Sequence, residues 1–283
     1  MVVEVVLSHQ QRAQLKAWFQ AQKNRRAPGS SVLEFPLDVD EVFGSGPRSG
    51  AALGVDYVEA MREHTLVDVG PVPAGGFRGE RCRSHLLRIE QRMRQHGIGA
   101  VVWDCGRTIC RFASRLPECE PSGRLSARVL DLGTGTGVVG IACWLRGADV
   151  TLTDVPEMLD LGRANALATL GDMPETLRVM PHVWGSDAAP LDPPFDLVFA
   201  SDCLYDVDAL PALLDTVLAV SDGGTVVYLA YKRRIDDRER PFFHTLQRHF
   251  GSVTFSDPRD TPAEWRGDGL FVCRLASKKS CAQ

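Results

Sequence analysis

The feature that most constrains the fold of this chain is a glycine-rich segment at residues 131–137, with the sequence DLGTGTG. It ends one apolar run and is followed by another at residues 138–145. Glycines at this spacing form a tight turn from a strand into a helix and let a nucleotide-like ligand approach the bare backbone. The segment therefore predicts an open parallel α/β sheet with a ligand site at the carboxyl ends of its strands.

Strand and helix patterns alternate through the rest of the chain. A strand at 83–89 leads into residues 97–102, and further strands are predicted at 128–132, 149–153, 178–184, 196–201, 225–231, 253–255 and 270–275. Helices are predicted at 103–114, 136–146, 156–170, 207–220 and 238–250. Such alternation implies crossover connections, and hence a mainly parallel sheet with helices on both faces.

The beginning of the chain is patterned differently. Residues 8–26 predict a basic amphipathic helix, and residues 27–76 read as loop-rich because glycine and proline interrupt them, with a short helix at 55–63. The predicted divisions are an N-terminal extension at 1–76, an α/β domain at 77–277 and a tail at 278–283.

The composition narrows the class of protein. With 44% hydrophobic and 24% charged residues the chain can bury a sizeable core. A net charge of −4 argues against a nucleic-acid-binding surface. The eight cysteines lack the spacing of a zinc site or a disulfide framework, and no apolar run approaches the roughly 20 residues of a membrane helix. We expect a monomeric cytosolic protein without metal, which can also enter the nucleus.

Two cofactors are compatible with the glycine pattern. Residues 135–140 also match G-x-G-x-x-G, the dinucleotide pattern, and Asp154 at the end of the next strand can hold the ribose of either cofactor. Asp131 discriminates between them, because a carboxylate before the turn repels a pyrophosphate. S-adenosylmethionine instead carries a cationic sulfonium and amino group. The sequence therefore favours S-adenosylmethionine, with a dinucleotide as the alternative.

Several segments taken together resemble a known family. They are Val102-Trp103-Asp104, the glycine segment, Gly147–Asp154, Val183-Trp184-Gly185, Asp202-Cys203-Leu204-Tyr205 and Tyr231–Arg234. In this order and spacing they resemble the seven-β-strand (class I) protein-lysine methyltransferases marked by a DxxY motif, methyltransferase family 16. The resemblance runs from about residue 85 to residue 255. It departs at residues 105–107, so we expect the N-terminal wall of the pocket to differ.

The resemblance implies a Rossmann-like seven-stranded sheet and gives roles to particular residues. Those implied to bind S-adenosylmethionine are Trp103, Asp131, Gly133, Thr134, Gly135, Asp154, Trp184 and Ser201. By resemblance, Trp103 lines the cofactor pocket, Trp184 packs near the adenine and Asp154 takes the ribose hydroxyls. Asp202 and Tyr205 are the implied catalytic pair.

Elementary electrostatics constrains what Asp202 can do. A lysine amine attacks a methyl group only when neutral, and holding it neutral at pH 7 costs roughly 4–5 kcal/mol. A nearby carboxylate favours the ammonium, so Asp202 is a poor general base for that amine. Its expected role is to stabilise the positive charge that builds on nitrogen during transfer, while Tyr205 orients the amine.

The sequence thus predicts methyl transfer from S-adenosylmethionine to a lysine of a protein substrate. The same fold also serves methylation of His, Arg, RNA or small molecules, and fold alone does not settle the acceptor. A cofactor-binding protein without turnover and a dinucleotide-dependent oxidoreductase are the remaining alternatives.

Overall fold

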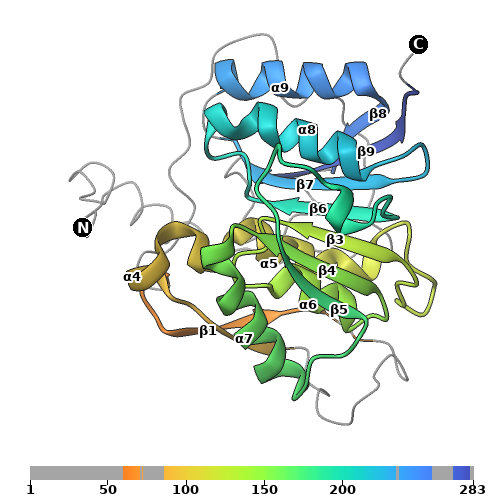
Figure 1. Cartoon of the computed structure of the whole chain (residues 1–283). Coiled ribbons are helices and arrows are strands. Elements are labelled where there is room, and N and C mark those ends of the chain that lie inside the picture. The colour runs from red at the N-terminus through yellow and green to blue at the C-terminus, as the bar shows by residue number, and fades with distance from the viewer. Residues whose placement is uncertain (1–59, 71, 73–85, 234–235, 257–269, 281–283) are drawn as a thin grey trace, which may run out of the picture.

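The structure is a computed structural model that describes residues 60–70, 72, 86–233, 236–256 and 270–280 (Figure 1). The helix predicted at 8–26 and most of that at 55–63 lie outside the described residues. Within the described part of the chain, no helix is both long and apolar enough to cross a bilayer.

A single large sheet organises the described residues. Seven strands are ordered β5-β4-β3-β6-β7-β9-β8. They are β3 (Arg128–Leu132), β4 (Asp149–Asp154), β5 (Leu177–Pro181), β6 (Leu197–Ser201), β7 (Val226–Lys232), β8 (Phe250–Phe255) and β9 (Leu270–Lys278). Strands β3 to β7 pair in parallel, whereas β9 is antiparallel to both β7 and β8. The predicted seven-stranded, mainly parallel sheet is confirmed.

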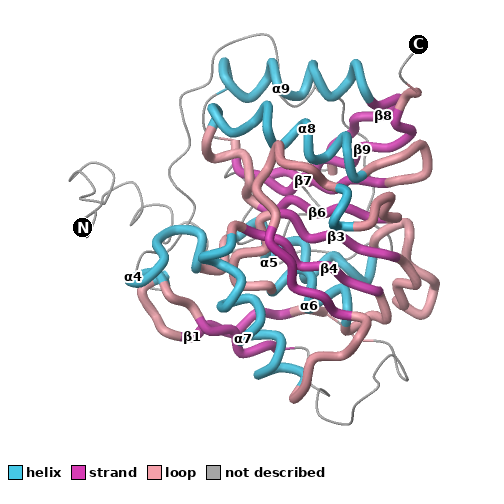
Figure 2. The backbone as a smooth tube through the Cα atoms, in the orientation of Figure 1, coloured by secondary structure: helices cyan, strands magenta, loops and turns pink. Residues whose placement is uncertain are grey.

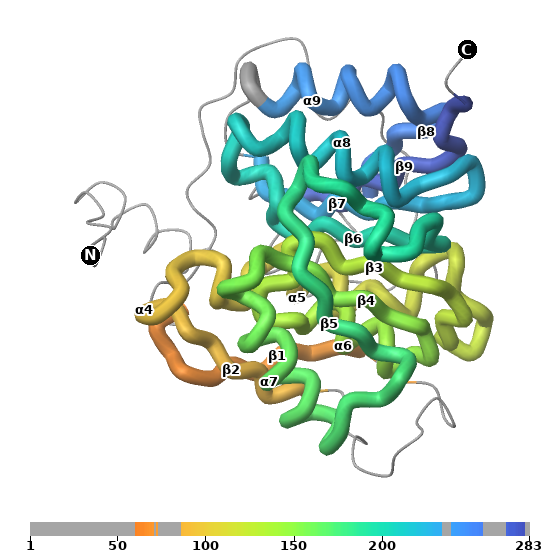
Figure 3. Tube along the Cα trace, in the orientation of Figure 1, coloured from red at the N-terminus to blue at the C-terminus, as the bar shows by residue number. Residues whose placement is uncertain are grey.

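The strand order places a crevice beside β3. From β3 the chain runs outward through β4 to β5, and then returns to β6 on the other side of β3 (Figure 3). The strand order therefore reverses between β3 and β6. Ligands of open α/β sheets bind outside the carboxyl ends of the strands at such a reversal.

Helices cover both faces of the sheet (Figure 2). They are α4 (Met93–His96), α5 (Asp104–Phe112), α6 (Val138–Trp144), α7 (Leu159–Leu170), α8 (Leu210–Val220) and α9 (Asp236–His249). Short 3-10 turns are η1 (Gly97–Ala100), η2 (Ala113–Arg115), η3 (Pro156–Met158), η4 (Ala189–Leu191) and η5 (Val207–Ala209).

Consecutive residues of one strand belong to two separate hydrophobic cores, one on each face of the sheet. Val129 and Phe199 pack with residues of α5 and α6, whereas Leu130 and Val198 pack with residues of α8 and α9. All four side chains are fully buried. Burial of both sheet faces explains why these strands read as continuous apolar runs in the sequence.

A second, two-stranded sheet includes part of the segment predicted to be loop-rich, of which the structure describes residues 60–70 and 72. Strand β1 (His64–Asp68) pairs antiparallel with β2 (Leu86–Glu90), and Val67 belongs to the core formed with α5 and α6. Five alternating residues between glycine-rich stretches are too short a signal to stand out. The division at residues 76 and 77 stays a prediction, and β9 reaches one residue into the predicted tail.

Two further differences lie close to the crevice. No helix was predicted between the strand at 83–89 and residue 103, yet α4 and η1 occupy the path from β2 to α5. Strand β5 ends at Pro181 rather than at residue 184, because the chain turns there. Gly185 takes a φ of 81°, and the Ser186 N–H donates to the Val183 carbonyl (N···O 3.0 Å).

Candidate active site

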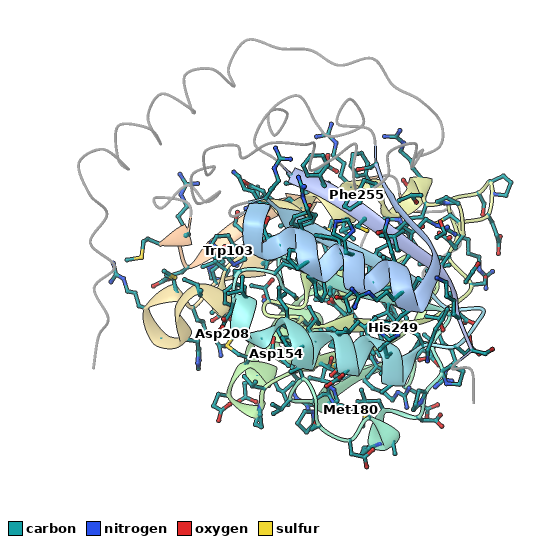
Figure 4. All side chains as sticks on the ribbon, turned by 90° about the horizontal axis from the view of Figure 1, so that it is seen from above. Trp103, Asp154, Met180, Asp208, His249 and Phe255 are labelled. Carbon is teal, nitrogen blue, oxygen red and sulfur yellow. The ribbon has the colours of Figure 1, made fainter. Side chains whose placement is uncertain are left out.

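All ten residues predicted to form the site line one cavity of about 780 Å³ at the carboxyl ends of the parallel strands. They are Trp103, Asp131, Gly133, Thr134, Gly135, Asp154, Trp184, Ser201, Asp202 and Tyr205. In Figure 4, Trp103 and Asp154 lie toward one end of the molecule, and His249, where α9 ends, lies toward the other. The cavity thus coincides with the crevice that the strand order predicts.

The glycine segment folds as a tight turn whose backbone conformation requires glycine at residues 133 and 135. Gly133 and Gly135 have φ values of 64° and 52°, in the left-handed region. A Cβ at Gly135 would lie 2.5 Å from the carbonyl oxygen of Gly99 in η1. Residue 135 must therefore be glycine, and bare backbone faces the cavity at this point.

The buried side chain of Asp131 stabilises that turn by hydrogen bonds. Its side chain is 1% exposed, and its Oδ2 accepts hydrogen bonds from the Thr134 hydroxyl (2.6 Å) and the Gly140 N–H (3.0 Å). Burial raises the pKa of Asp131 to about 7. The carboxylate therefore joins the glycine turn to the first turn of α6, in addition to lining the cavity.

Asp154 ends β4 at the next position along the rim. Its Oδ2 accepts from the Gly135 N–H and its Oδ1 from the Val155 N–H, both at 2.8 Å. Burial raises the pKa of Asp154. A carboxylate oxygen can accept more than one hydrogen bond, so both oxygens of Asp154 can still accept hydrogen bonds from the hydroxyls of a ribose.

Two tryptophans form part of the wall. The Trp103 Nε1–H donates to the Ile98 carbonyl (2.8 Å), so this indole holds η1 in place. Trp184 lies in the turn after β5, and its Cζ2 would be 3.0 Å from a Cβ at Gly133. Because Gly133 has no side chain, the Trp184 ring packs against the glycine turn.

Several residues of the cavity wall were not predicted from the sequence. Ile98, Val155 and Val183 are exposed by 42%, 38% and 52%, and all three line the cavity, as does the buried His182. Apolar side chains exposed around a cavity suit a flat apolar ligand group. An apolar residue directly after Asp154 was the one local signal in the sequence.

Another part of the cavity wall, which we call the acceptor end, consists of Asp202 and Tyr205. Asp202 is 8% exposed and has a φ of 58°, and its N–H donates to the Ala230 carbonyl (2.7 Å). Tyr205 is 56% exposed. Partial burial of its ring, together with neighbouring negative groups, raises the pKa of Tyr205, so its phenol stays protonated at neutral pH.

The wall contributed by α5 contains the segment where the chain departs from the family pattern. Gly106 lines the cavity, and a Cβ there would lie 3.7 Å from the Ser201 hydroxyl, which is buried without a hydrogen-bond partner among the described residues. Arg107 points elsewhere and donates to the Thr65 hydroxyl (2.7 Å) and the Leu66 carbonyl (2.8 Å). The departure therefore attaches β1 to the pocket wall.

Comparison with known proteins decides the family. The lysine methyltransferase family model matches residues 81–249, which is more than half of the chain. The chain belongs to the lysine methyltransferase family.

Two relatives agree with this membership, and a solved structure of lower similarity is given with them. Protein N-lysine methyltransferase METTL21A of Danio rerio is 34% identical to this lysine methyltransferase over 182 residues, 62% of this chain and 81% of the relative. EEF1A lysine methyltransferase 3 of Mus musculus is 33% identical over 168 residues, 59% of this chain and 70% of the relative. A TehB-like SAM-dependent methyltransferase from Corynebacterium glutamicum has a TM-score of 0.42 at 18% identity, covering 54% of this chain and 80% of that one.

This lysine methyltransferase has the Rossmann-like class I fold, and S-adenosylmethionine is its cofactor. The described residues fit that cofactor. The cavity has the volume of a typical small-molecule site. The positive-φ glycines leave backbone bare, Asp154 can accept hydroxyls, and the unpartnered Ser201 hydroxyl lines the same cavity. When bound, S-adenosylmethionine supplies a methyl group on a positively charged sulfur.

Proposed function

We propose that this chain methylates a lysine side chain of a protein substrate, with the cofactor held along residues 133–135 and Asp154 and the acceptor amine beside Asp202. One observation carries the proposal: the residues of the cofactor end and the pair Asp202 and Tyr205 line the same cavity. A donor and an acceptor bound there share one enclosed space, as direct transfer requires.

The acceptor amine must lose its proton before it can attack. Keeping a lysine neutral at pH 7 costs roughly 4–5 kcal/mol, and a carboxylate nearby increases that cost. Tyr205 cannot remove the proton at neutral pH, because its raised pKa keeps the phenol protonated. We therefore assign the proton to water at the cavity mouth, where Tyr205 is 56% exposed.

Asp202 acts on the charge that develops on the acceptor. As the new N–C bond forms, positive charge moves onto the lysine nitrogen, and a fixed carboxylate beside it lowers the energy of the transition state. Asp202 suits this role because its backbone is fixed by the hydrogen bond to Ala230 and its side chain is 8% exposed. Little reorganisation is then needed during transfer.

Tyr205 suits a role in positioning. Its hydroxyl oxygen can accept a hydrogen bond from an N–H of the neutral amine, which leaves the amine lone pair free to attack, and its ring forms a wall of the cavity mouth. The aliphatic part of a lysine side chain can pack along this ring while the nitrogen reaches Asp202.

The partner is proposed from chemistry and relatives. The relatives are named as methyltransferases of protein lysines, one of them of EEF1A. We propose a protein acceptor for this chain as well, and a monomer that acts in the cytoplasm with access to the nucleus. The net charge of −4 supports a protein rather than a nucleic acid as substrate.

The test uses the full chain, tritiated S-adenosylmethionine and host cell extract. We expect label on one or a few proteins, and mass spectrometry should place the added methyl groups on lysine. Asp202→Asn, assayed in parallel, should leave these proteins unlabelled. Label in RNA or metabolites with none in protein would overturn the proposal.

A further inference from the structure

A buried hydroxyl on α8 holds the turn that carries Trp184. We propose that Thr216 is a positioning residue for the adenine side of the cofactor site, acting through His182 and Gly185. This inference rests on the proposed function. Thr216 is 1% exposed and is absent from the cavity wall, so any effect on the cofactor must pass through the residues that it binds.

One oxygen atom of Thr216 contacts both ends of the turn. Its Oγ1 accepts the Gly185 N–H (2.8 Å) and lies 3.2 Å from the His182 Nε2. A hydroxyl has two acceptor sites and one proton, so it can bond Gly185 and either tautomer of the His182 ring together. Residues 182 and 185 are thereby fixed to the same point of α8.

His182 is itself tied to the rest of the site. It is 5% exposed, and its backbone N–H donates to the Asp154 carbonyl (2.9 Å). Its Nδ1 lies 3.5 Å from the Ser186 hydroxyl, which donates to the Val183 carbonyl (2.6 Å). The turn is therefore anchored to β4 on one side and to α8 on the other.

The two residues between these anchors face the cavity. Val183 and Trp184 both line it, and Val183 is 52% exposed. The Trp184 ring already touches the glycine turn at Gly133. A displacement of the 182–185 turn would therefore move an apolar and an aromatic wall together, on the side where a flat purine is expected to pack.

The alternative is that Thr216 contributes only to stability. A buried hydroxyl whose hydrogen bonds are satisfied stabilises the fold whether or not a cofactor binds nearby. The same holds for Thr225, which is also 1% exposed, accepts the Asp222 N–H (2.9 Å) and donates to the Phe195 carbonyl (2.7 Å). Thr225 lies just before β7, away from the cavity wall, and offers a matched control.

The experiment compares Thr216→Val, Thr216→Ser and Thr225→Val in the full chain, by calorimetric binding of S-adenosylmethionine. We expect Thr216→Val to weaken binding by about tenfold, which is the effect of one lost hydrogen bond at the upper end of its usual range. Thr216→Ser keeps the hydroxyl and should bind within about twofold of the wild type. Thr225→Val should lower the melting temperature about as much as Thr216→Val does, and it should leave the affinity for S-adenosylmethionine unchanged.

Two further readouts separate positioning from stability. At saturating S-adenosylmethionine, the kcat of Thr216→Val on labelled extract proteins should stay within about twofold of the wild type. In the Trp184→Phe background, removal of the Thr216 hydroxyl should cost much less affinity, because coupled residues are not additive. Thr216→Ala removes the same hydroxyl without added bulk and replaces Thr216→Val if the valine variant folds poorly.

The outcomes are distinct. If Thr216→Val binds cofactor as tightly as Thr225→Val, or if its effect is additive with Trp184→Phe, the positioning role is wrong while the proposed function stands. If the wild type neither binds S-adenosylmethionine nor labels protein, the proposed function fails, and the inference fails with it.

Discussion

The two ends of the cavity are held in place in different ways. At the cofactor end, Asp131 and Asp154 both accept hydrogen bonds from backbone N–H groups of the glycine turn and its flanks. At the acceptor end, Asp202 has a left-handed backbone and Tyr205 is 56% exposed. The chain itself therefore completes the cofactor end, whereas the acceptor end stays open toward the substrate.

This difference separates two kinds of defect. A change at the cofactor end should disturb binding and folding together, because the same atoms do both. A change at the acceptor end should disturb turnover alone. Variants at each end therefore test whether binding and turnover are separated in this way.

The largest effect is expected for Asp202→Asn. Asparagine tolerates the φ of 58°, so the backbone is kept while the negative charge is lost. We expect kcat to fall by about 100-fold or more, the usual loss for one electrostatic contact to a transition state. The dissociation constant for S-adenosylmethionine should change by less than about threefold. Near-normal turnover would show that the acceptor end does not work through this charge.

Gly135→Ala should have the next largest effect, and on binding rather than turnover. The new Cβ would lie 2.5 Å from the Gly99 carbonyl oxygen at a φ of 52°. We expect the free energy of unfolding to fall by about 2 kcal/mol or more, and cofactor binding to weaken at least tenfold.

The control for Gly135→Ala is Gly147→Ala. Gly147 also has a positive φ, 102°, but a Cβ there meets no atom closer than 3.4 Å, and the residue lies away from the cavity. It should lose stability and keep cofactor affinity. Equal affinity in the two variants would contradict the view that close approach shapes the cofactor end. Both quantities can be measured by denaturant unfolding and calorimetry.

The remaining effect concerns the charge of Asp131, and it is on stability rather than on turnover. Burial raises its pKa from the ordinary 3.8 to about 7, so the folded protein binds a proton that the unfolded chain releases. The wild type should therefore lose stability as the pH rises from about 4 through 7. Asp131→Asn lacks this group, so without cofactor its melting temperature should rise relative to that of the wild type as the pH increases over this range. A constant difference between the two melting curves at all pH values would contradict the buried charge.

Much of the central sheet was predictable because it is buried on both faces. The apolar runs of β3, β6 and β7 place the strands within about a residue of the structure. Strand β1 and the segment α4–η1 were not predictable, since their short patterns depend on packing against α5 and the glycine turn. The predicted end of β5 was also wrong, because the turn after it is held by a hydrogen bond to α8 that the local sequence does not reveal.

The candidate site divides in the same way. Asp131, Asp154 and Asp202 could be located because each lies at or just beyond the last two residues of a parallel strand, and such ends converge on one rim. His182 and Thr216 escaped notice, because their importance lies in hydrogen bonds between segments far apart in the chain. The contacts of the Arg107 guanidinium with Thr65 and Leu66 belong to the same class.

The close approach of Gly99 to Gly135 has a consequence for assembly. During synthesis the η1 segment emerges well before the glycine turn, yet neither forms its share of the cavity without the other. A ribosome-bound fragment that stops before residue 135 therefore presents no cofactor pocket. Competence to bind S-adenosylmethionine arises only after later residues of the same cavity, among them Asp154, Trp184 and Ser201, have joined these two segments, so bound cofactor can report that the cavity is fully assembled.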